Sequence, residues 1–336
     1  MFSKRLGIDL GTANSLVYVV GQGVVVNEPT VVAVSVDDGR VLAVGNEAKQ
    51  MLGRTPGNIR ASRPMRDGVI ADYIVTEAML RYFLDRVCGG TRLFKPEVMI
   101  CVPAGVTQVE RRAVLDATLS AGAKVAYLID EPLAAAIGAK IPIANPNGNM
   151  IVDIGGGSTE AAVISLGGVV VHKSARVAGN KIDEAIQNYI KKKFNLLIGD
   201  QTAEEVKISI GSAVPLGKAE KNSMEVRGRD AATGLPRIIQ FTTDEVVEAV
   251  STILSQISNV FRTVLEETPP ELASDIIDRG IVLSGGTSLL RNLDKYMTHS
   301  IGVPVHVADD PLFCVVKGCG IAMENIDLYK RSISRK

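Results

Sequence analysis

The hydrophobic positions of the chain predict the same order of elements in two halves. The elements expected in the first half are strands within 6–36, a helix over 74–87, a strand over 97–102, a helix over 107–120 and a strand over 125–129. The elements expected in the second half are a pair of strands from Met150, a helix over 182–194, a helix over 243–265 and a strand over 281–283 that leads into a helix. Strand runs followed by helices, twice, predict an α/β fold built by duplication.

Two segments interrupt this order and predict small insertions. Residues 37–70 are rich in turn-forming residues, and residues 212–241 are Gly-rich and charged, which is typical of a hairpin. The segment 145–149 contains only polar and helix-breaking residues, so we expect the chain to cross there from one lobe to the other. A chain of 336 residues exceeds the roughly 250–300 residues that one core serves, which also favours two lobes.

Two Thr–Glu pairs have the spacing of a helix-capping box. Thr107 precedes Glu110, and Thr202 precedes Glu205. In such a box the hydroxyl accepts from the N–H of the third helical residue, whose carboxylate reaches back to the N-cap N–H. We therefore expect helices to begin directly after Thr107 and Thr202.

Two short segments share one strand–turn–strand pattern, which consists of an apolar strand that ends in Asp, a Gly/Ser/Thr turn and a second apolar strand. The first turn follows Asp9 and the second follows Asp153. A glycine-rich hairpin turn can direct backbone N–H groups and a hydroxyl at one place, which makes an anion site. The residues expected at the phosphates of a nucleotide are Gly11, Thr12, Ala13 and Asn14 in the first turn and Gly155, Gly156, Gly157 and Ser158 in the second.

Two such turns that face each other can hold a polyphosphate from both sides. Asp9 and Asp153 would then lie where a magnesium ion, bound through water, neutralises the phosphates. The simpler alternative is a pair of ordinary hairpin turns. The presence of two equivalent turns in two equivalent halves favours nucleotide binding over that alternative.

Charge and composition argue against several other functions. Lys plus Arg and Asp plus Glu both number 37, so the net charge gives no reason to expect a nucleic-acid partner. The four cysteines lack C-x-x-C spacing and the three histidines are scattered, which favours buried reduced thiols over a zinc site or disulfides. Because no signal-peptide stretch and no apolar run of about 18 residues is present, we expect a cytoplasmic protein.

The two aspartate-led turns and the turn at 284–286 resemble the two phosphate loops and the adenosine loop of the actin-like ATPases. Four longer motifs are similar to the MreB family of bacterial actins: 26–30 (VNEPT), 63–71 (RPMRDGVIA), 128–138 (LIDEPLAAAIG) and 268–277 (TPPELASDII). The resemblance covers nearly the whole chain. It implies an actin-like (ribonuclease H-like) duplicated α/β fold, with two lobes that each carry a small inserted subdomain and a nucleotide cleft between them.

The resemblance also implies a division of the chain into four subdomains. These are subdomain IA (1–32, 66–145 and 311–336), subdomain IB (33–65), subdomain IIA (146–181 and 243–310) and subdomain IIB (182–242).

For the cleft, the resemblance implies ATP or ADP with Mg²⁺. Glu131 is expected to position the attacking water, with Thr159 as a hydrogen-bonding partner, because phosphoryl transfer to water needs an oriented nucleophile. Without the resemblance, Glu131 is an acidic residue that complements a helix dipole. The residues expected to flank the adenine and ribose are Glu204, Glu205, Val206 and Lys207, for which a solvated helix start is the alternative. The other residues implied at the nucleotide are Gly179, Asn180, Asp183, Ser284, Gly285, Gly286 and Thr287.

Two of these positions depart from the usual pattern of the family. Asn180 stands where an aspartate is common, which removes a negative charge near the nucleotide. Thr287 stands where a third glycine is usual, which narrows the adenosine loop. Neither residue belongs to the pair Glu131 and Thr159, so we expect hydrolysis to persist.

Leu93 and Phe94 lie in a loop between Arg92 and Lys95. By resemblance they form a membrane-inserting tip, and the alternative is that both side chains are tucked into the core. Burial of both side chains is worth about 3–6 kcal/mol, which is marginal for a monomer but strong for many copies on one filament. The two flanking cations favour an anionic membrane surface.

The family implies an ATP-dependent, membrane-associated filament that organises cell-wall elongation and rod shape at the inner face of the cell membrane, with slow ATP hydrolysis. Its implied partners are further copies of the chain, an anionic membrane surface and proteins of the wall-elongation machinery. Three alternatives stay open. They are a scaffold that binds ATP with little hydrolysis, a sugar kinase of the same superfamily, for which no catalytic aspartate can be assigned, and a chaperone-type ATPase, which would need a further substrate-binding domain.

Overall fold

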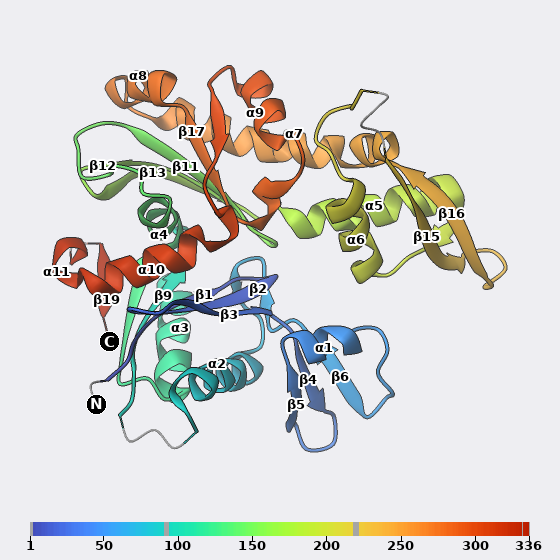
Figure 1. The fold of residues 1–336 in the computed structure, drawn as a ribbon, viewed down its shortest axis with the longest axis horizontal. Coiled ribbons are helices and arrows are strands. Elements are labelled where there is room, and N and C mark those ends of the chain that lie inside the picture. The colour runs from blue at the N-terminus through green and yellow to red at the C-terminus, as the bar shows by residue number, and fades with distance from the viewer. Residues whose placement is uncertain (1–2, 91–93, 218–221, 331, 336) are drawn as a thin grey trace.

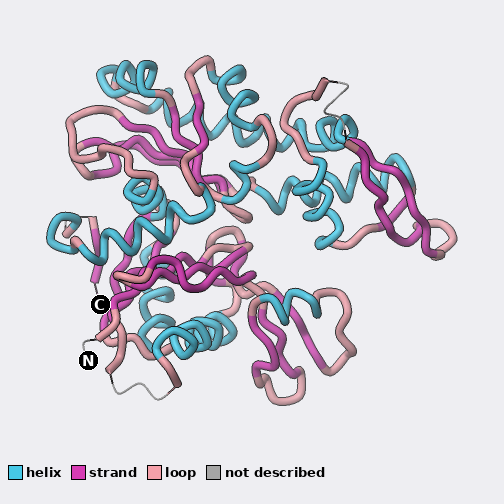
Figure 2. The backbone as a smooth tube through the Cα atoms, in the orientation of Figure 1, coloured by secondary structure: helices cyan, strands magenta, loops and turns pink. Residues whose placement is uncertain are grey.

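The computed structural model describes residues 3–90, 94–217, 222–330 and 332–335. Two large sheets form the body of the molecule, and the helices α4 (Glu131–Gly138) and α10 (Cys314–Glu324) lie between them (Figure 1). Two small sheets project to the right in this view, one from each lobe (Figure 2). The fold therefore has two lobes, each with a large and a small part.

The first large sheet has the strand order β19-β10-β9-β1-β2-β3. Its strands are β1 (Arg5–Leu10), β2 (Asn14–Val19), β3 (Gly23–Pro29), β9 (Glu97–Val102), β10 (Val125–Asp130) and β19 (Ile333–Arg335). β1 pairs antiparallel with β2 and parallel with β9, which pairs parallel with β10. Alternate side chains of β9 enter two different cores, which explains why this strand is apolar throughout.

The second large sheet has the strand order β13-β12-β11-β17-β18. Its strands are β11 (Asn149–Ile154), β12 (Thr159–Ser165), β13 (Gly168–Ala175), β17 (Ile281–Ser284) and β18 (Val305–Val307). β11 pairs antiparallel with β12 and parallel with β17, which pairs parallel with β18. This pairing repeats the arrangement of β3, β2, β1, β9 and β10, so the duplication predicted from the sequence is present in the fold.

The helices α4 and α10 pack against each other and against both large sheets in one shared core. Two glycines permit their close approach. A Cβ atom on Gly138 would lie 1.8 Å from the Cys314 carbonyl oxygen, and one on Gly318 would lie 1.8 Å from the Ala134 carbonyl oxygen. The shared core joins the two lobes on the side away from the small sheets (Figure 1).

Each lobe carries one small sheet. The first consists of β4 (Val32–Ser35), β5 (Val41–Val44) and β6 (Ile59–Ser62), with the helix α1 (Asn46–Met51) against it. The second consists of β14 (Leu196–Leu197), β15 (Ser223–Asp230) and β16 (Pro236–Thr242), beside the helices α5 (Gly179–Phe194) and α6 (Asp200–Ile210). Both insertions that the composition predicts therefore contain a sheet.

The remaining elements cover the outer faces of the large sheets or connect them. On the first lobe these are β7 (Met65–Arg66), β8 (Val69–Ile70), α2 (Tyr73–Cys88), α3 (Gln108–Ser120) and α11 (Ile326–Tyr329). On the second lobe they are α7 (Thr243–Glu267), α8 (Pro270–Arg279), the 3₁₀ helix η1 (Gly286–Leu289), α9 (Leu293–Ile301) and the 3₁₀ helix η2 (Pro311–Phe313). None of the helices in the described part of the chain has the length and apolar character needed to span a membrane.

Of the two predicted capping boxes, one is confirmed and one is wrong. The helix α3 begins after Thr107, whose hydroxyl accepts from the Glu110 N–H at 3.3 Å, while the Glu110 carboxylate accepts from the Thr107 N–H at 2.7 Å. Thr202, by contrast, lies inside α6, which begins at Asp200 after the N-cap Gly199. The turn at 284–286 also leads into a 3₁₀ helix rather than directly into an α-helix.

Candidate functional site

The two glycine-rich hairpin turns face each other in the lining of a cavity of about 550 Å³, to which both lobes contribute. This volume is typical of small-molecule sites. The predicted residues that line the cavity are Asp9, Gly11, Thr12, Ala13, Asn14, Glu131, Asp153, Gly155, Gly156, Gly157, Ser158, Gly179, Asn180, Glu204, Lys207, Gly285, Gly286 and Thr287. The fold therefore brings most of the predicted site residues together from segments that are far apart in the sequence.

The two turns touch each other, and two glycines make this contact possible. A Cβ atom on Gly157 would lie 2.5 Å from the Thr12 Oγ1 atom, and a Cβ atom on Gly156 would lie 2.6 Å from the Ala13 Cβ atom. The backbone N–H groups of both turns can therefore approach one ligand without intervening side chains.

A third turn, which the sequence analysis did not single out, supports this contact. The Gly68 N–H donates to the Thr12 Oγ1 atom at 3.0 Å, and Gly68 lines the cavity. Asp67 and Gly68 both have positive φ angles, of 52° and 81°, as a tight hairpin turn between β7 and β8 requires. The Asp-Gly pair at this point of the sequence was a turn signal, but its position next to Thr12 depends on the tertiary fold.

Asp9, Asp153 and Glu131 bring three carboxyl groups to the cavity. Burial and the charge of Asp153 raise the pKa of Asp9 to about 7, although the Cys101 thiol donates to Asp9 at 3.5 Å. Burial also raises the pKa of Asp153. Burial, together with the charges of Asp153, Glu160 and Asp9, holds the pKa of Glu131 well above its usual range.

Burial is the main cause of these raised pKa values, and it disfavours the ionised carboxylates unless a cation lies beside them. Hard oxygen ligands of this kind suit Mg²⁺ held through water and phosphate oxygens. Within the described residues, no group of three or more His, Cys, Asp or Glu side chains is arranged to hold a metal ion by itself. The carboxyl groups of Asp9 and Asp153 therefore fit a cation that a ligand brings with it, rather than a cation held by the protein alone.

Glu131 reaches the cavity because it begins α4 directly after the end of β10. Pro132 occupies the first turn of this helix, where a missing N–H costs no hydrogen bond. The neighbouring Asp130 accepts from Arg111 at 2.5 Å, whereas Glu131 lines the cavity.

Some predicted residues lie outside the lining of the cavity. The Thr159 hydroxyl is fully buried and donates to the Val177 carbonyl oxygen at 2.6 Å. The Ser284 hydroxyl is also buried and donates to the Asp153 Oδ1 atom at 2.6 Å, so it orients that carboxylate from below. On α6, Val206 points into the core of the second lobe and Glu205 is exposed to solvent.

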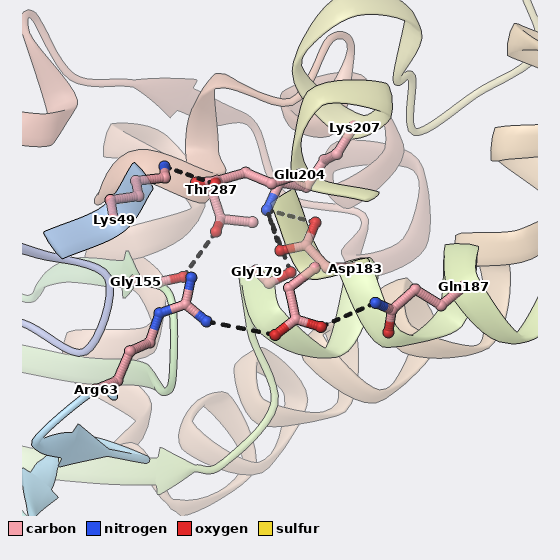
Figure 3. Close-up of polar contacts among 10 residues, drawn as sticks. Lys49, Arg63, Gly155, Gly179, Asp183, Gln187, Glu204, Lys207 and Thr287 are labelled. Atoms are coloured by element: carbon pink, nitrogen blue, oxygen red, sulfur yellow. Dashed lines mark hydrogen bonds and ion pairs between the residues drawn. The ribbon is translucent and has the colours of Figure 1, made fainter. Parts of the chain in front are cut away.

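Asp183 pairs with Lys207 at 2.9 Å beside the cavity (Figure 3). Burial raises the pKa of Asp183 to about 6, against the opposing effect of the Lys207 charge. Lys207 also donates to the Gly179 carbonyl oxygen at 3.3 Å. The pair therefore fixes α6 against the first turn of α5.

The two small parts of the lobes meet across the mouth of the cavity (Figure 3). Lys49 on α1 forms an ion pair of 2.7 Å with Glu204 on α6, and the Gln201 side chain donates to the Lys49 carbonyl oxygen at 2.6 Å. Arg63 lies 3.9 Å from Asp200 at the start of α6. Glu204 is therefore both a lining residue and part of a bridge between the lobes, which its sequence position could not reveal.

Two exposed apolar side chains line the same cavity. Ile208 on α6 is 74% exposed and Leu289 at the end of η1 is 62% exposed. Exposed apolar side chains inside a cavity mark a surface that a flat apolar group can cover. The sequence analysis missed both residues because their spacing is that of ordinary helix positions.

The predicted membrane tip is only partly described. Leu93 lies outside the described residues, and Phe94 is 59% exposed. The Phe94 side chain therefore does not pack into the core.

Known proteins are similar to this chain over nearly its whole length. A model of the MreB/Mbl protein family matches residues 3–331. The cell shape-determining protein MreB of Escherichia coli (strain K12) is 53% identical over 334 residues, which cover 98% of this chain and 96% of that protein. The cell shape-determining protein Mbl of Bacillus subtilis (strain 168) is 49% identical over 335 residues, which cover 99% of this chain and all of that protein.

Solved structures extend the comparison to the fold. The crystal structure of MreB5 of Spiroplasma citri bound to ADP has a TM-score of 0.91 and 40% identity, and covers 97% of this chain and 98% of that one. The crystal structure of the same protein bound to AMPPNP has a TM-score of 0.92 and 39% identity, and covers 98% of this chain and 99% of that one. A MamK double helical filament, at 24% identity, has a TM-score of 0.81 over 96% of this chain and 99% of that chain. The actin-like fold expected from the sequence is thereby confirmed.

Proposed function

The chain belongs to the MreB/Mbl family, and we propose that it is an ATP-dependent, filament-forming cytoskeletal protein that helps to determine cell shape. The observation that carries the proposal is the pair of facing hairpin turns on a cavity shared by two lobes. The Spiroplasma relatives whose structures contain ADP and AMPPNP support a nucleotide as the ligand. The proposal keeps the four-subdomain division that the resemblance implies.

In this proposal the two turns bind the phosphates of ATP or ADP from opposite lobes. Asp9 and Asp153 hold Mg²⁺ through water, and the ion supplies charge neutralisation for the phosphates. The apolar surfaces of Ile208 and Leu289 cover the adenine, and Glu204 offers its carboxylate to the ribose as well as to Lys49. A nucleotide in this position therefore contacts both lobes.

We further propose slow ATP hydrolysis with Glu131 as the residue that orients the attacking water. Glu131 lies at the cavity, and its side chain needs only to accept from the water and hold it in line with the terminal phosphate. The Thr159 hydroxyl already donates to Val177, so it can offer only its lone pairs to this water. Because Thr159 is buried outside the cavity lining, Glu131 is the residue that contacts this water directly.

Head-to-tail contacts between identical chains that do not close a ring generate filaments. The test is electron microscopy of the full chain on an anionic lipid monolayer, with ATP and Mg²⁺ and without nucleotide. We expect filaments on the lipid only with nucleotide. A protein shown to be folded that leaves the lipid bare in both conditions would overturn the proposal, and sugar-dependent turnover of ATP would then identify a kinase.

We also propose that the loop of Leu93 and Phe94 attaches the filament to the inner face of the cell membrane, where proteins of wall elongation are its partners. Replacement of both residues by serine is expected to abolish sedimentation with anionic liposomes, because the pair contributes about 3–6 kcal/mol of apolar burial per copy. ATP-dependent assembly in solution, followed by light scattering, is expected to remain.

A matched control removes two exposed apolar side chains elsewhere. Leu166 and Leu235, which are 70% and 65% exposed, lie in turns of other hairpins. Their replacement by serine should leave liposome sedimentation unchanged. Sedimentation of the Leu93 and Phe94 variant at the level of the unmodified chain contradicts the membrane role.

A further inference from the structure

Three segments of the site meet at one backbone atom, the Gly155 carbonyl oxygen. Gly155 belongs to the second phosphate turn, and its carbonyl accepts from the Gly179 N–H at 3.2 Å, at the first turn of α5. The same carbonyl accepts from the Thr287 hydroxyl at 2.7 Å (Figure 3). Thr287 lies in η1, directly after the Gly285-Gly286 turn.

Thr287 contributes its side chain to these two bonds, whereas Gly155 and Gly179 contribute backbone atoms. It is buried, and a Cβ atom on Gly179 would lie 2.6 Å from its Oγ1 atom. The Asn180 N–H is also occupied, since it donates to the Gly156 carbonyl oxygen at 2.8 Å. The first N–H groups of α5 therefore stabilise the phosphate turn from behind and are not free to bind a phosphate themselves.

Other hydrogen bonds also hold the loop that carries Thr287. The Gly285 N–H donates to the Pro311 carbonyl oxygen at 2.9 Å, and the Ser288 hydroxyl donates to the Gly285 carbonyl oxygen at 2.6 Å. These bonds fix the local shape of the loop. The base of the loop is tied to the same turn, because β17 pairs with β11, the Ser284 hydroxyl donates to Asp153 at 2.6 Å and the Gly285 backbone lies against Ile154. Beyond this base, the bond from Thr287 to Gly155 is the side-chain contact that joins η1 to the phosphate turn.

We propose that Thr287 is a positioning residue that fixes the spacing between the adenosine side and the phosphate side of the nucleotide site. The inference rests on the proposed ATP binding. A ligand that spans both sides must match this spacing, and a preformed spacing removes an ordering cost that such a ligand would otherwise meet. A ligand that occupies one side alone gains nothing from the bond.

The test compares Thr287→Val with Thr287→Ser. Valine keeps the shape and removes the hydroxyl, while the Gly179 N–H still satisfies the Gly155 carbonyl, so we expect both variants to fold. Affinities for ATP, for adenosine and for tripolyphosphate are measured with Mg²⁺ by competition against a fluorescent ADP analogue. We expect Thr287→Val to lower the affinity for ATP about three- to tenfold and to change the affinities for adenosine and tripolyphosphate by no more than about twofold. Thr287→Ser should bind all three ligands with nearly the affinities of the unmodified chain.

Two results overturn the inference. One is equal ATP affinity in Thr287→Val and the unmodified chain. The other is an equal loss for ATP and both half-ligands, which would indicate a general loosening of the site. Failure of the unmodified chain to bind ATP would refute the proposed function itself, and is therefore distinct from both.

Discussion

Replacement of Gly157 by valine is expected to weaken ATP binding strongly while both lobes stay folded. A Cβ atom at this position would lie 2.5 Å from the Thr12 Oγ1 atom and 2.9 Å from the Thr12 Cβ atom. Neither contact can be relieved by a flexible chain end, because the Thr12 hydroxyl also accepts from the Gly68 N–H. The two turns must therefore separate.

Separation of the turns is expected to weaken ATP binding more than it destabilises the fold. Overpacking of this kind costs about 1–3 kcal/mol. Because a nucleotide must contact both turns at once, we expect this cost to fall on the bound state and to lower ATP affinity about five- to 150-fold, since each 1.4 kcal/mol is a factor of ten. Isothermal titration with ATP and Mg²⁺ measures the affinity, and thermal unfolding without nucleotide measures the integrity of the fold.

Gly57 provides the matched control. It lies in a turn of the first small sheet, and a Cβ atom placed on it meets no atom within 4 Å. Gly57→Val should bind ATP like the unmodified chain. ATP affinity within about threefold of the unmodified value in Gly157→Val would show that the contact between the turns does not govern binding.

Much of this site could be predicted because it consists of local signals. The strand over 97–102 and the helix that follows Thr107 lie where their hydrophobic runs and capping box predicted them. The two aspartate-led turns could be recognised because each is a continuous segment with a glycine-rich turn. The duplicated pairing of β1 and β11 then follows from the repeated order of strands and helices.

The parts of the site that were not predicted from the sequence depend on contacts that no local sequence pattern specifies. Gly68 supports Thr12 from a turn 56 positions away along the chain, and Lys49 reaches Glu204 over 155 positions. The apolar side chains of Ile208 and Leu289 can be recognised as site residues only from their position in the cavity. Burial of the Thr159 and Ser284 hydroxyls beneath the cavity is likewise a property of the assembled sheet.

The wrong capping box at Thr202 has a different cause. A Thr–Glu pair three residues apart is also compatible with the interior of a first turn, and the helix α6 extends back to Asp200. An acidic residue at the first position favours the helix N-terminus electrostatically, so Asp200 serves the start of the helix in place of Thr202. The pattern identified the helix correctly and its first residue wrongly.

Replacement of Glu131 by glutamine is expected to lower phosphate release from ATP about a hundredfold without weakening ATP binding. The amide keeps the size of the side chain but cannot take up a proton, and it is a much poorer hydrogen-bond acceptor than the carboxylate that Glu131 forms once a cation offsets the charges of Asp9 and Asp153. A positioned acid or base of this kind contributes about 10²–10⁴-fold. ATP affinity should stay the same or rise, because the charges of Asp153 and Asp9 already oppose the ionised form of Glu131. Phosphate release in assembled protein and ATP titration together give both quantities, with Glu266→Gln, an exposed acid on α7, as the control. Turnover equal to that of the control would remove Glu131 from the hydrolytic role, whereas a parallel loss of ATP affinity would indicate a role in binding instead.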